Sequence, residues 1–205
     1  MVNISYAICV CNEDRELRSL LNFLLKVKDE GDEINILFDS KNGTDATRRL
    51  LESMRDHIVV NEREFDGNFA EHRNYHSSKC KGDYIFAIDA DEMPPEGLIL
   101  NIKSFDGDIM YIPRINICPG YTAEWLDSHK FNLNEMGWIN FPDYQGRYWK
   151  NDGKIKWDGG LHEKLVGADP SKVARLDPKP LVSLLHIKTV ERQDKQGDFY
   201  NNLKP

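Results

Sequence analysis

Several features that define other classes of protein are missing from this sequence of 205 residues. No stretch approaches the roughly 18 consecutive apolar residues that a membrane helix needs. The start, from Met1 to Tyr6, does not combine a basic region, an apolar run and a small-residue cleavage site, as a secretory signal would. We therefore expect a cytoplasmic protein that does not insert stably into a membrane, although peripheral contact with one is compatible with the sequence.

Cysteine is scarce, with four residues at Cys9, Cys11, Cys80 and Cys118. They do not form the paired C-x-x-C knuckles of a zinc site. Reduced cysteines that serve packing in a cytosolic protein are the favoured interpretation.

An excess of positive charge is also missing, because the formal net charge is −7. Residues 1–100 hold 12 Lys and Arg against 20 Asp and Glu, a balance of −8, whereas residues 101–205 hold 15 against 14, a balance of +1. The acidic first half argues against broad, non-specific nucleic-acid binding. The nearly neutral second half is compatible with an anionic acceptor.

The first hundred residues alternate between strand and helix signals. Short apolar runs of β-forming residues predict strands, and leucine recurrence or capping residues predict helices. The predicted strands are 4–10, 34–38, 58–60 and 84–88, and the predicted helices are 17–25, 44–54 and 68–80. This alternation indicates an α/β fold with a mostly parallel, doubly wound sheet. We also expect a small antiparallel part in the C-terminal half.

Polar residues follow three of these strands: Asn12-Glu13, Asp39, and Asp89-Ala90-Asp91. Ligands of doubly wound sheets bind at the carboxyl ends of the strands. We therefore expect these side chains to converge on one crevice.

The second half has a weaker pattern. We expect a helix to Ile102, a strand at 108–115, a long aromatic loop at 117–143, short strands within 144–166, a strand at 181–187 and a charged surface helix at 191–200. The length fits one domain. We expect residues 1–96 to bind a nucleotide and residues 97–205 to bind the acceptor and supply catalytic groups.

Asp89 and Asp91 are separated by one small residue, Ala90, directly after a buried strand. Mg²⁺ and Mn²⁺ prefer oxygen ligands, and they commonly take one or two carboxylates together with substrate phosphate oxygens. The alternative is a solvated acidic turn. Two carboxylates at this spacing form a weak pattern alone, but the preceding strand and Asp39 on a neighbouring strand favour a metal and diphosphate site.

Four segments together resemble the family 2 glycosyltransferases, which have the GT-A fold. In order and spacing these segments are Ile8–Glu13, Asp39–Thr47, Phe69–Asn74 and Lys81–Glu92. Residues 142–147, 159–163 and 185–188 more loosely resemble segments of small bacterial and phage members. If the chain is encoded by a phage, we expect it in the cytoplasm of the host. The resemblance implies a transferase that uses a nucleotide-sugar donor, with UDP-sugar favoured, and Mn²⁺ or Mg²⁺.

The resemblance also implies roles for single residues. Cys9, Cys11 and Glu13 would line the nucleotide-base pocket, and Asp39 would contact the base or ribose, with turn capping as its alternative role. Arg73 would meet the base or phosphates, although a solvated helix face is the plainer interpretation. Asp89 would lie near the ribose and metal, with Ala90 allowing close approach of the backbone. Asp91 would bind the metal, and His186 would complete the site, unless His186 is an ordinary core histidine.

Two further residues are candidates for the chemistry. Glu163, after Gly159-Gly160 and His162, is the candidate general base, with Asp127 and Asp143 as rivals and a purely structural loop contact as the alternative. Arg147 is the candidate diphosphate clamp, because arginine matches phosphate in two-point geometry. An exposed basic hairpin is the alternative for the surrounding lysines.

These expectations define an inverting, metal-dependent transfer of a sugar to an acceptor hydroxyl, with inversion implied by the resemblance. The acceptor would be a glycan or, less favoured, a modified DNA base. A sugar-nucleotide nucleotidyltransferase is a rival, but it usually has a glycine-rich loop after the first strand, and Cys11-Asn12-Glu13 has none. A non-catalytic carbohydrate-binding protein that uses its tryptophans is the second rival.

Overall fold

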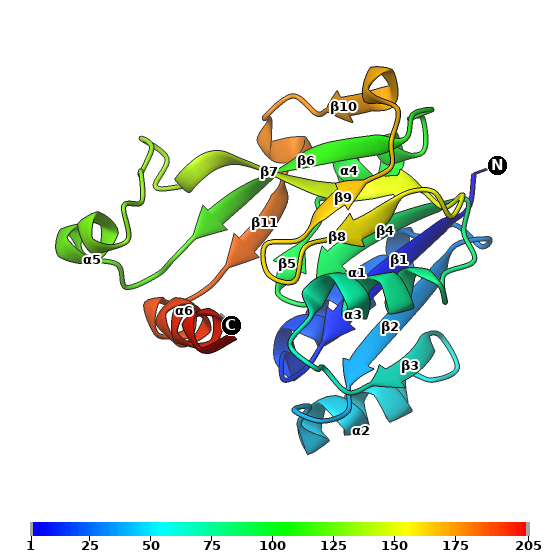
Figure 1. The fold of residues 1–205 in the computed structure, drawn as a ribbon, viewed down its shortest axis with the longest axis horizontal. Helices are drawn as coiled ribbons and strands as arrows, with labels where there is room; N and C mark the ends of the chain where they lie inside the picture. The colour runs from blue at the N-terminus through cyan, green and yellow to red at the C-terminus, as the bar shows by residue number, and fades with distance from the viewer. Residues whose placement is uncertain (1, 204–205) are drawn as a thin grey trace.

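A computed structural model describes residues 2–203. A large mixed sheet forms the centre of the molecule, with the strand order β3-β2-β1-β4-β7-β6-β11-β5 and with β10 paired to β6 (Figure 1). Strands β1 to β4 are mutually parallel, and β7 runs antiparallel to both β4 and β6. The expected mostly parallel, doubly wound sheet with an antiparallel part is confirmed.

The first half follows the predicted alternation closely. Its strands are β1 (Ile4–Val10), β2 (Glu33–Asp39), β3 (Val59–Arg63), β4 (Tyr84–Asp89) and β5 (Glu92–Met93). Its helices are α1 (Asp14–Val27), α2 (Asp45–Ser53), α3 (Phe69–Ser77) and α4 (Glu96–Ile102). Helix α2 begins after Thr44, whose side chain accepts a hydrogen bond from the Thr47 N–H, as capping chemistry predicts.

The second half departs from the sequence pattern. Its strands are β6 (Ile109–Ile117), β7 (Ile139–Lys150), β8 (Lys156–Asp158), β9 (Lys164–Val166), β10 (Val173–Arg175) and β11 (Leu184–Ile187). Its helices are α5 (Ala123–Ser128), α6 (Val190–Leu203) and two short 3₁₀ turns at Pro170–Lys172 and Pro180–Val182.

Two predicted boundaries in this half are wrong. The loop expected to reach residue 143 ends at Ile139, where β7 begins and pairs with β6 over most of its length. Register shifts between Met110 and Tyr111 and between Arg114 and Asn116 break the alternation that would have revealed this strand. The last sheet strand begins at Leu184 rather than at Leu181, because Pro180–Val182 forms a 3₁₀ turn.

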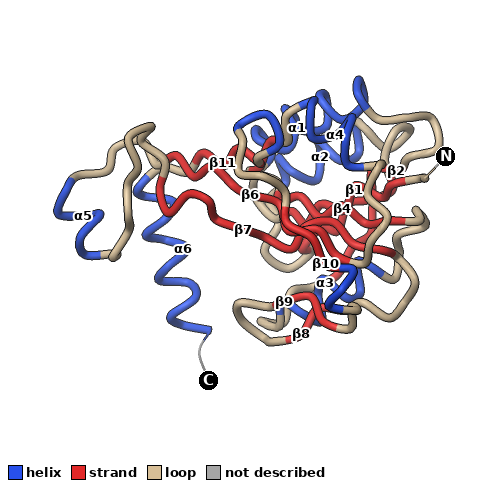
Figure 2. The backbone as a smooth tube through the Cα atoms, turned by 90° about the horizontal axis from the view of Figure 1, so that it is seen from above, coloured by secondary structure: helices blue, strands red, loops and turns tan. Residues whose placement is uncertain are grey.

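The sheet has helices on both faces (Figure 2). Helices α1, α2 and α4 cover one face, where the larger apolar cluster includes Leu17, Leu20 and Phe38. Helix α3 and the β8–β9 hairpin cover the other face, where Ala70, Trp149 and Trp157 belong to a second cluster. The two layers of packing fix the central strands, and so they fix the loops at the strand ends.

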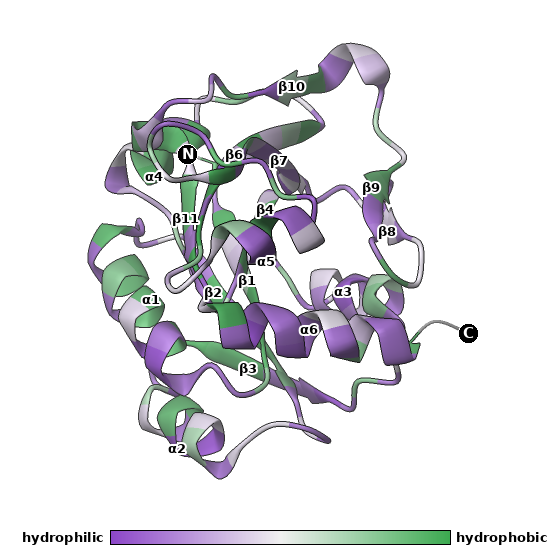
Figure 3. Cartoon of the chain, turned by 90° about the vertical axis from the view of Figure 1, so that its left-hand side faces the viewer, coloured by the Kyte–Doolittle hydropathy of each residue, from purple (hydrophilic) through white to green (hydrophobic). Residues whose placement is uncertain are grey.

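Helix α6 crosses in front of the ends of β1, β2 and β4 rather than lying on either face of the sheet (Figure 3). The expected surface helix therefore exists, but it covers the edge of the sheet where the polar residues gather. Among residues 2–203, no helix combines the length and the apolar character required to cross a bilayer.

Candidate functional site

The ends of β1 and β4 are brought together by their parallel register, in which Cys9 pairs with Asp89. On the other side of β1, Val10 pairs with Phe38, so Asp39 follows at the same edge. The three polar segments that the sequence places after strands thus lie at one end of the sheet. That part of the arrangement depends only on parallel pairing.

Asp89 lies between two arginines. One carboxylate oxygen, Oδ1, accepts hydrogen bonds from Arg73 Nη2 at 3.0 Å and from Arg147 Nη1 at 3.2 Å, and Oδ2 accepts from Arg147 Nη2. Burial alone would raise the pKa of the Asp89 carboxyl, but the charges of Arg147 and Arg73 hold that pKa well below its usual value. Asp89 is therefore an anion in this structure, held in a fixed orientation.

The ion-pair network continues away from the strand ends. Arg147 Nη2 donates to Glu92 Oε1 at 2.6 Å, and Arg114 Nη1 donates to the same oxygen at 3.0 Å. Arg114 also donates through Nη2 to Asp143 Oδ2 at 2.7 Å. Because Arg147 is only 4% exposed and already has two carboxylate partners, its guanidinium acts here mainly to fix Asp89 and Glu92.

Glu163 reaches the same cluster from a separate loop. Arg73 Nε donates to Glu163 Oε1 at 2.6 Å, and the Arg73 guanidinium lies 5.1 Å from the centre of the Trp157 ring. The loop is held on α3 by a hydrogen bond from the Phe69 N–H to the Gly160 carbonyl oxygen. His162, directly before Glu163, has a φ of 60°, a conformation that non-glycine residues adopt rarely.

Asp91 and His186 meet as the sequence expects. His186 Nε2 lies 3.5 Å from Asp91 Oδ2, and its Nδ1 lies 2.8 Å from Asn116 Oδ1. Burial raises the pKa of the Asp91 carboxyl, but His186 and the Lys188 ammonium outweigh that effect and lower it. Lys188 Nζ is 3.3 Å and Arg192 Nη2 is 3.8 Å from the same oxygen, so three basic groups surround Asp91.

Asp91 and His186 are the side chains here that could bind a divalent cation together with substrate oxygens. Across residues 2–203, no group of three or more His, Cys, Asp and Glu side chains is placed to hold a metal ion. The Asp91 carboxylate and the His186 imidazole lie 3.5 Å apart. A metal ion bound by these two groups would need oxygens from the diphosphate and from water to complete its coordination shell. One or two carboxylates together with substrate phosphates are the usual ligands of Mg²⁺, whereas an imidazole is a less usual ligand for that ion.

The carboxylates of Asp39 and Glu13 already accept hydrogen bonds from backbone N–H groups. Asp39 Oδ1 accepts from the N–H groups of Lys41, Asn42 and Phe65. Burial raises the pKa of Asp39, but the bonds from Asn42 and Phe65 bring it below its usual value. Glu13 Oε2 accepts from the N–H groups of Cys11 and Asn12, so both carboxylates stabilise the turns at the ends of β1 and β2.

Cys9, Cys11 and Ala90 offer little side-chain chemistry. Cys9 Sγ lies 3.4 Å from His76 Nδ1, on the α3 side of the sheet, and burial raises the pKa of its thiol to about 11. Burial raises the pKa of the Cys11 thiol to about 12, and all four cysteines are free thiols. The Ala90 side chain is 3% exposed, so only backbone atoms of this residue are available to a ligand.

The rival bases are placed differently from Glu163. Asp143 is held by Arg114 and Asn116, whose Nδ2 lies 2.9 Å from Asp143 Oδ2. Asp127 lies in α5, outside the cluster around Asp89. Three residues at the site were not assigned a role from the sequence. Lys188 lies within the segment 185–188 that resembles other family members, and Arg192 and Tyr200 lie on α6.

The comparisons with known proteins bear on the fold and the family. Solved structures of S. aureus TarS 1-349 superpose with TM-scores of 0.60 for the UDP-GlcNAc complex and 0.57 for the UDP complex. Sequence identity is 15% and 12%, and the matches cover 91% and 99% of this chain but 58% and 65% of those chains. The chain thus spans less than two thirds of these TarS chains, and at this identity the likeness shows the fold, which is GT-A.

No curated protein matches the sequence significantly. The family model described as "Glycosyl transferase family 2" matches residues 5–159, which include the ends of β1, β2 and β4 and the Arg73–Asp89 pair. The fold, the position of the site and this match agree, and the chain belongs to glycosyl transferase family 2.

Proposed function

We propose that this chain transfers a sugar from a UDP-sugar to an acceptor hydroxyl, with inversion at the anomeric carbon and with Mn²⁺ or Mg²⁺ as cofactor. In this proposal residues 1–96 bind the nucleotide, and residues 97–205 supply the base and bind the acceptor, a glycan or, less favoured, a modified DNA base. The TarS structures that share the fold were solved with UDP-GlcNAc and UDP, which supports a uridine donor.

One observation carries the proposal: Asp91 faces His186 while Asp89 is fixed by Arg73 and Arg147. A carboxylate that only capped a turn would need neither the imidazole nor the lysine and arginine placed around it. Cationic groups around Asp91 also suit a diphosphate, whose oxygens would accept from Lys188 and Arg192.

Each group has a part in the proposed reaction. Asp39 and Glu13 accept hydrogen bonds from backbone N–H groups and so hold the loops that would receive the base and ribose. Arg73 holds Glu163 beside Asp89, where Glu163 accepts the proton of the acceptor hydroxyl. Arg147 keeps Asp89 in place, so its influence on the diphosphate is exerted through that carboxylate. When bound, the divalent cation supplies charge that stabilises the departing nucleoside diphosphate.

The test is calorimetric titration of UDP with and without Mn²⁺. The wild-type chain should bind UDP more tightly with Mn²⁺, and Asp91→Asn should lose that dependence. Asp56→Asn removes the same charge from an exposed residue before β3, at the other end of the sheet, and should behave as wild type. Binding that is indifferent to Mn²⁺ in all three proteins would reject the metal site.

The reaction itself is tested by release of UDP from a panel of UDP-sugars. Slow, metal-dependent hydrolysis without an acceptor would support transfer chemistry. Release of pyrophosphate from a nucleoside triphosphate and a sugar phosphate, with no reaction of any UDP-sugar, would favour the nucleotidyltransferase. Binding of sugar that survives Asp91→Asn, with no turnover of any donor, would favour the carbohydrate-binding protein.

A further inference from the structure

Asn116 joins His186 to the ion-pair network around Asp89. Asn116 and His186 are direct partners in the parallel pairing of β6 with β11, which lie side by side in Figure 1. The side-chain oxygen Oδ1 of Asn116 lies 2.8 Å from His186 Nδ1, and its nitrogen Nδ2 donates to Asp143 Oδ2 at 2.9 Å. Asn116 therefore bridges the candidate metal ligand His186 and the half-buried carboxylate of Asp143.

The orientation of the Asn116 amide is fixed by the groups around its nitrogen. Nδ2 lies 2.9 Å from Asp143 Oδ2 and 3.4 Å from the Ile139 carbonyl oxygen. Burial raises the pKa of the Asp143 carboxyl, but the charge of Arg114 outweighs that effect and lowers it, so Asp143 is ionised and can only accept. A carbonyl oxygen also only accepts. If the amide were turned over, its oxygen would face two other acceptors, so Oδ1 faces His186.

The contact with Asn116 Oδ1 requires a proton on His186 Nδ1. An amide oxygen has lone pairs and no proton, so the 2.8 Å contact is a hydrogen bond only when Nδ1 donates. The second ring nitrogen, Nε2, lies 3.5 Å from Asp91 Oδ2, which is longer than the usual N–H···O separation of about 2.7–3.2 Å. A neutral imidazole has a single N–H proton, and this geometry assigns that proton to Nδ1.

The Asp91 carboxylate has positive neighbours besides the imidazole. Lys188 Nζ lies 3.3 Å and Arg192 Nη2 lies 3.8 Å from Asp91 Oδ2. These two cations compensate the carboxylate without a proton from His186. On a neutral ring, Nε2 therefore keeps its lone pair, and it lies beside the carboxylate proposed to bind the metal.

We infer that Asn116 is a positioning residue that keeps His186 in the tautomer with its proton on Nδ1, so that Nε2 can bind a divalent cation together with Asp91. This inference rests on the proposed function, because it assumes a cation at Asp91. Histidine ligands of metals almost always donate their other ring N–H to an outer partner, which fixes the tautomer and the ring orientation. Asn116 is that partner for His186, and Asp143 holds Asn116 in turn.

Nitrogen NMR measures the tautomer in the metal-free protein. The chain is prepared with isotope-labelled histidine and recorded at about pH 9, above the usual histidine pKa of about 6.5, and the His186 signals are those missing in His186→Gln. We expect a protonated Nδ1 and an unprotonated Nε2. In Asn116→Leu the proton should move to Nε2, where Asp91 can accept it. Asn116→Asp keeps an acceptor oxygen and should restore the wild-type tautomer.

The consequence for the metal is measured by calorimetric titration of Mn²⁺ in the presence of saturating UDP. Asn116→Leu should bind Mn²⁺ about 10–100-fold more weakly, the usual effect of losing such an outer partner, and Asn116→Asp should recover most of the affinity. Asn101→Leu makes the same change at an exposed position of α4. This control should keep both the wild-type tautomer and the wild-type affinity.

Three results would overturn the inference. They are a wild-type His186 with its proton on Nε2, an Asn116→Leu protein that keeps the proton on Nδ1, and an Mn²⁺ affinity that does not change in Asn116→Leu. If the wild-type chain binds no Mn²⁺ in the presence of UDP, the proposed function fails instead. The tautomer is measured without metal or nucleotide, so the two failures are distinguishable.

Discussion

Arg73 donates to Glu163 through Nε while it donates to Asp89 through Nη2, so a single guanidinium joins the end of β4 to a distant loop. The separation along the chain is 90 residues for Glu163 and 16 for Asp89. Trp157 packs against the same guanidinium and limits its movement. The position of Glu163, the candidate base, is therefore set by Arg73, which also binds Asp89, a candidate residue for binding the nucleotide-sugar.

Glu163→Gln should remove the base while the loop is preserved, because a glutamine oxygen can still accept from Arg73 Nε. We expect sugar transfer to fall by about 10²–10⁴-fold, the usual contribution of general base catalysis. UDP affinity should stay within about twofold of wild type, since the change is small and leaves the charge of the diphosphate site intact. Asp127→Asn and Asp143→Asn are assayed in parallel, with UDP release as the measurement. If one of these variants loses transfer and Glu163→Gln does not, the substituted aspartate is the base.

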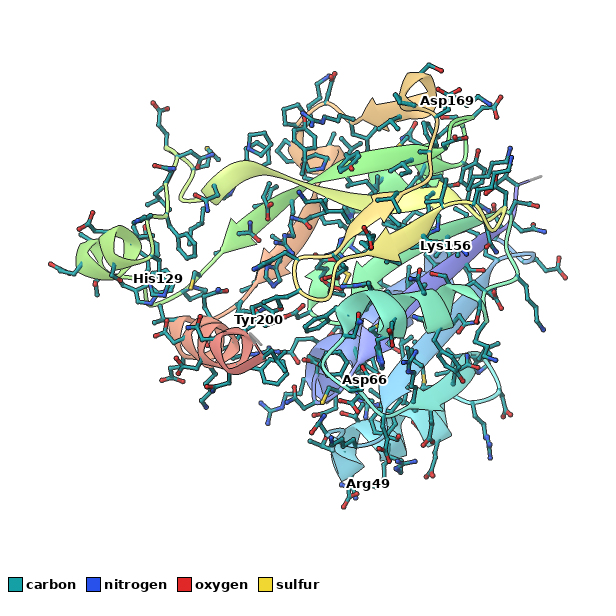
Figure 4. The ribbon with its side chains drawn as sticks, in the orientation of Figure 1. Arg49, Asp66, His129, Lys156, Asp169 and Tyr200 are labelled. Atoms are coloured by element: carbon teal, nitrogen blue, oxygen red, sulfur yellow. The ribbon has the colours of Figure 1, made fainter. Side chains whose placement is uncertain are left out.

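Arg73→Ala should lower the free energy of unfolding by about 3 kcal/mol, because it leaves Asp89 and Glu163 without a shared partner in a mostly buried site. The side chains of Arg73 and Glu163 are 15% and 13% exposed, so solvent compensates only in part. Urea unfolding followed by circular dichroism measures the change. Arg49→Ala is the control, because Arg49 is exposed on α2 (Figure 4), and a loss of stability there equal to that of Arg73→Ala would contradict the prediction.

Stability should fall as the pH drops from 6.5 toward 4. Burial lowers the pKa of His72 to about 4 and that of His76 to about 3, whereas the unfolded chain binds protons from about pH 6.5 downward. Protons therefore favour the unfolded state throughout this window, by an amount on the order of a few kcal/mol. Urea midpoints at intervals of one pH unit measure it.

His72→Phe is the matching variant for that series, because Phe keeps the edge contact with Phe65 and has no group to protonate. Nδ1 of His72 is buried and has no hydrogen-bond partner in the described part of the chain. The substitution therefore breaks no hydrogen bond at that atom. It should reduce the slope of the pH dependence above pH 4.5 by about half, because His76 still contributes. An unchanged slope in this variant would show that His72 does not contribute.

Gly82→Ala should destabilise the protein by about 1–3 kcal/mol. An added Cβ at this position would lie 2.5 Å from the Ser5 backbone nitrogen and 2.8 Å from the Ile4 carbonyl carbon, so β1 would have to move. Gly197→Ala is the contrast, because nothing lies within 4 Å of its added Cβ and alanine favours a helix. Thermal unfolding of both variants should show opposite changes, and equal changes would contradict the packing argument.

Much of the first half could be predicted from local sequence. Central strands such as Tyr84–Asp89 are continuous apolar runs, and parallel pairing then places Asp39 and Asp89 at one edge of the sheet. The first residues of strand β7 were assigned to a loop, because the register shifts against β6 disturb the alternation of apolar and polar residues. The pairing of Asp91 with His186 was also expected, but from the family resemblance rather than from any spacing.

The sequence by itself determined the doubly wound sheet and the edge at which its polar residues gather, because strand period and parallel order are local properties of the chain. Only the tertiary structure decided which partner each charge has. Arg147 turned to Asp89 and Glu92, and Arg192 on a helix of ordinary surface composition reached Glu13 and Asp91. A long flexible side chain has many partners within reach, and the packing of distant elements around it selects among them.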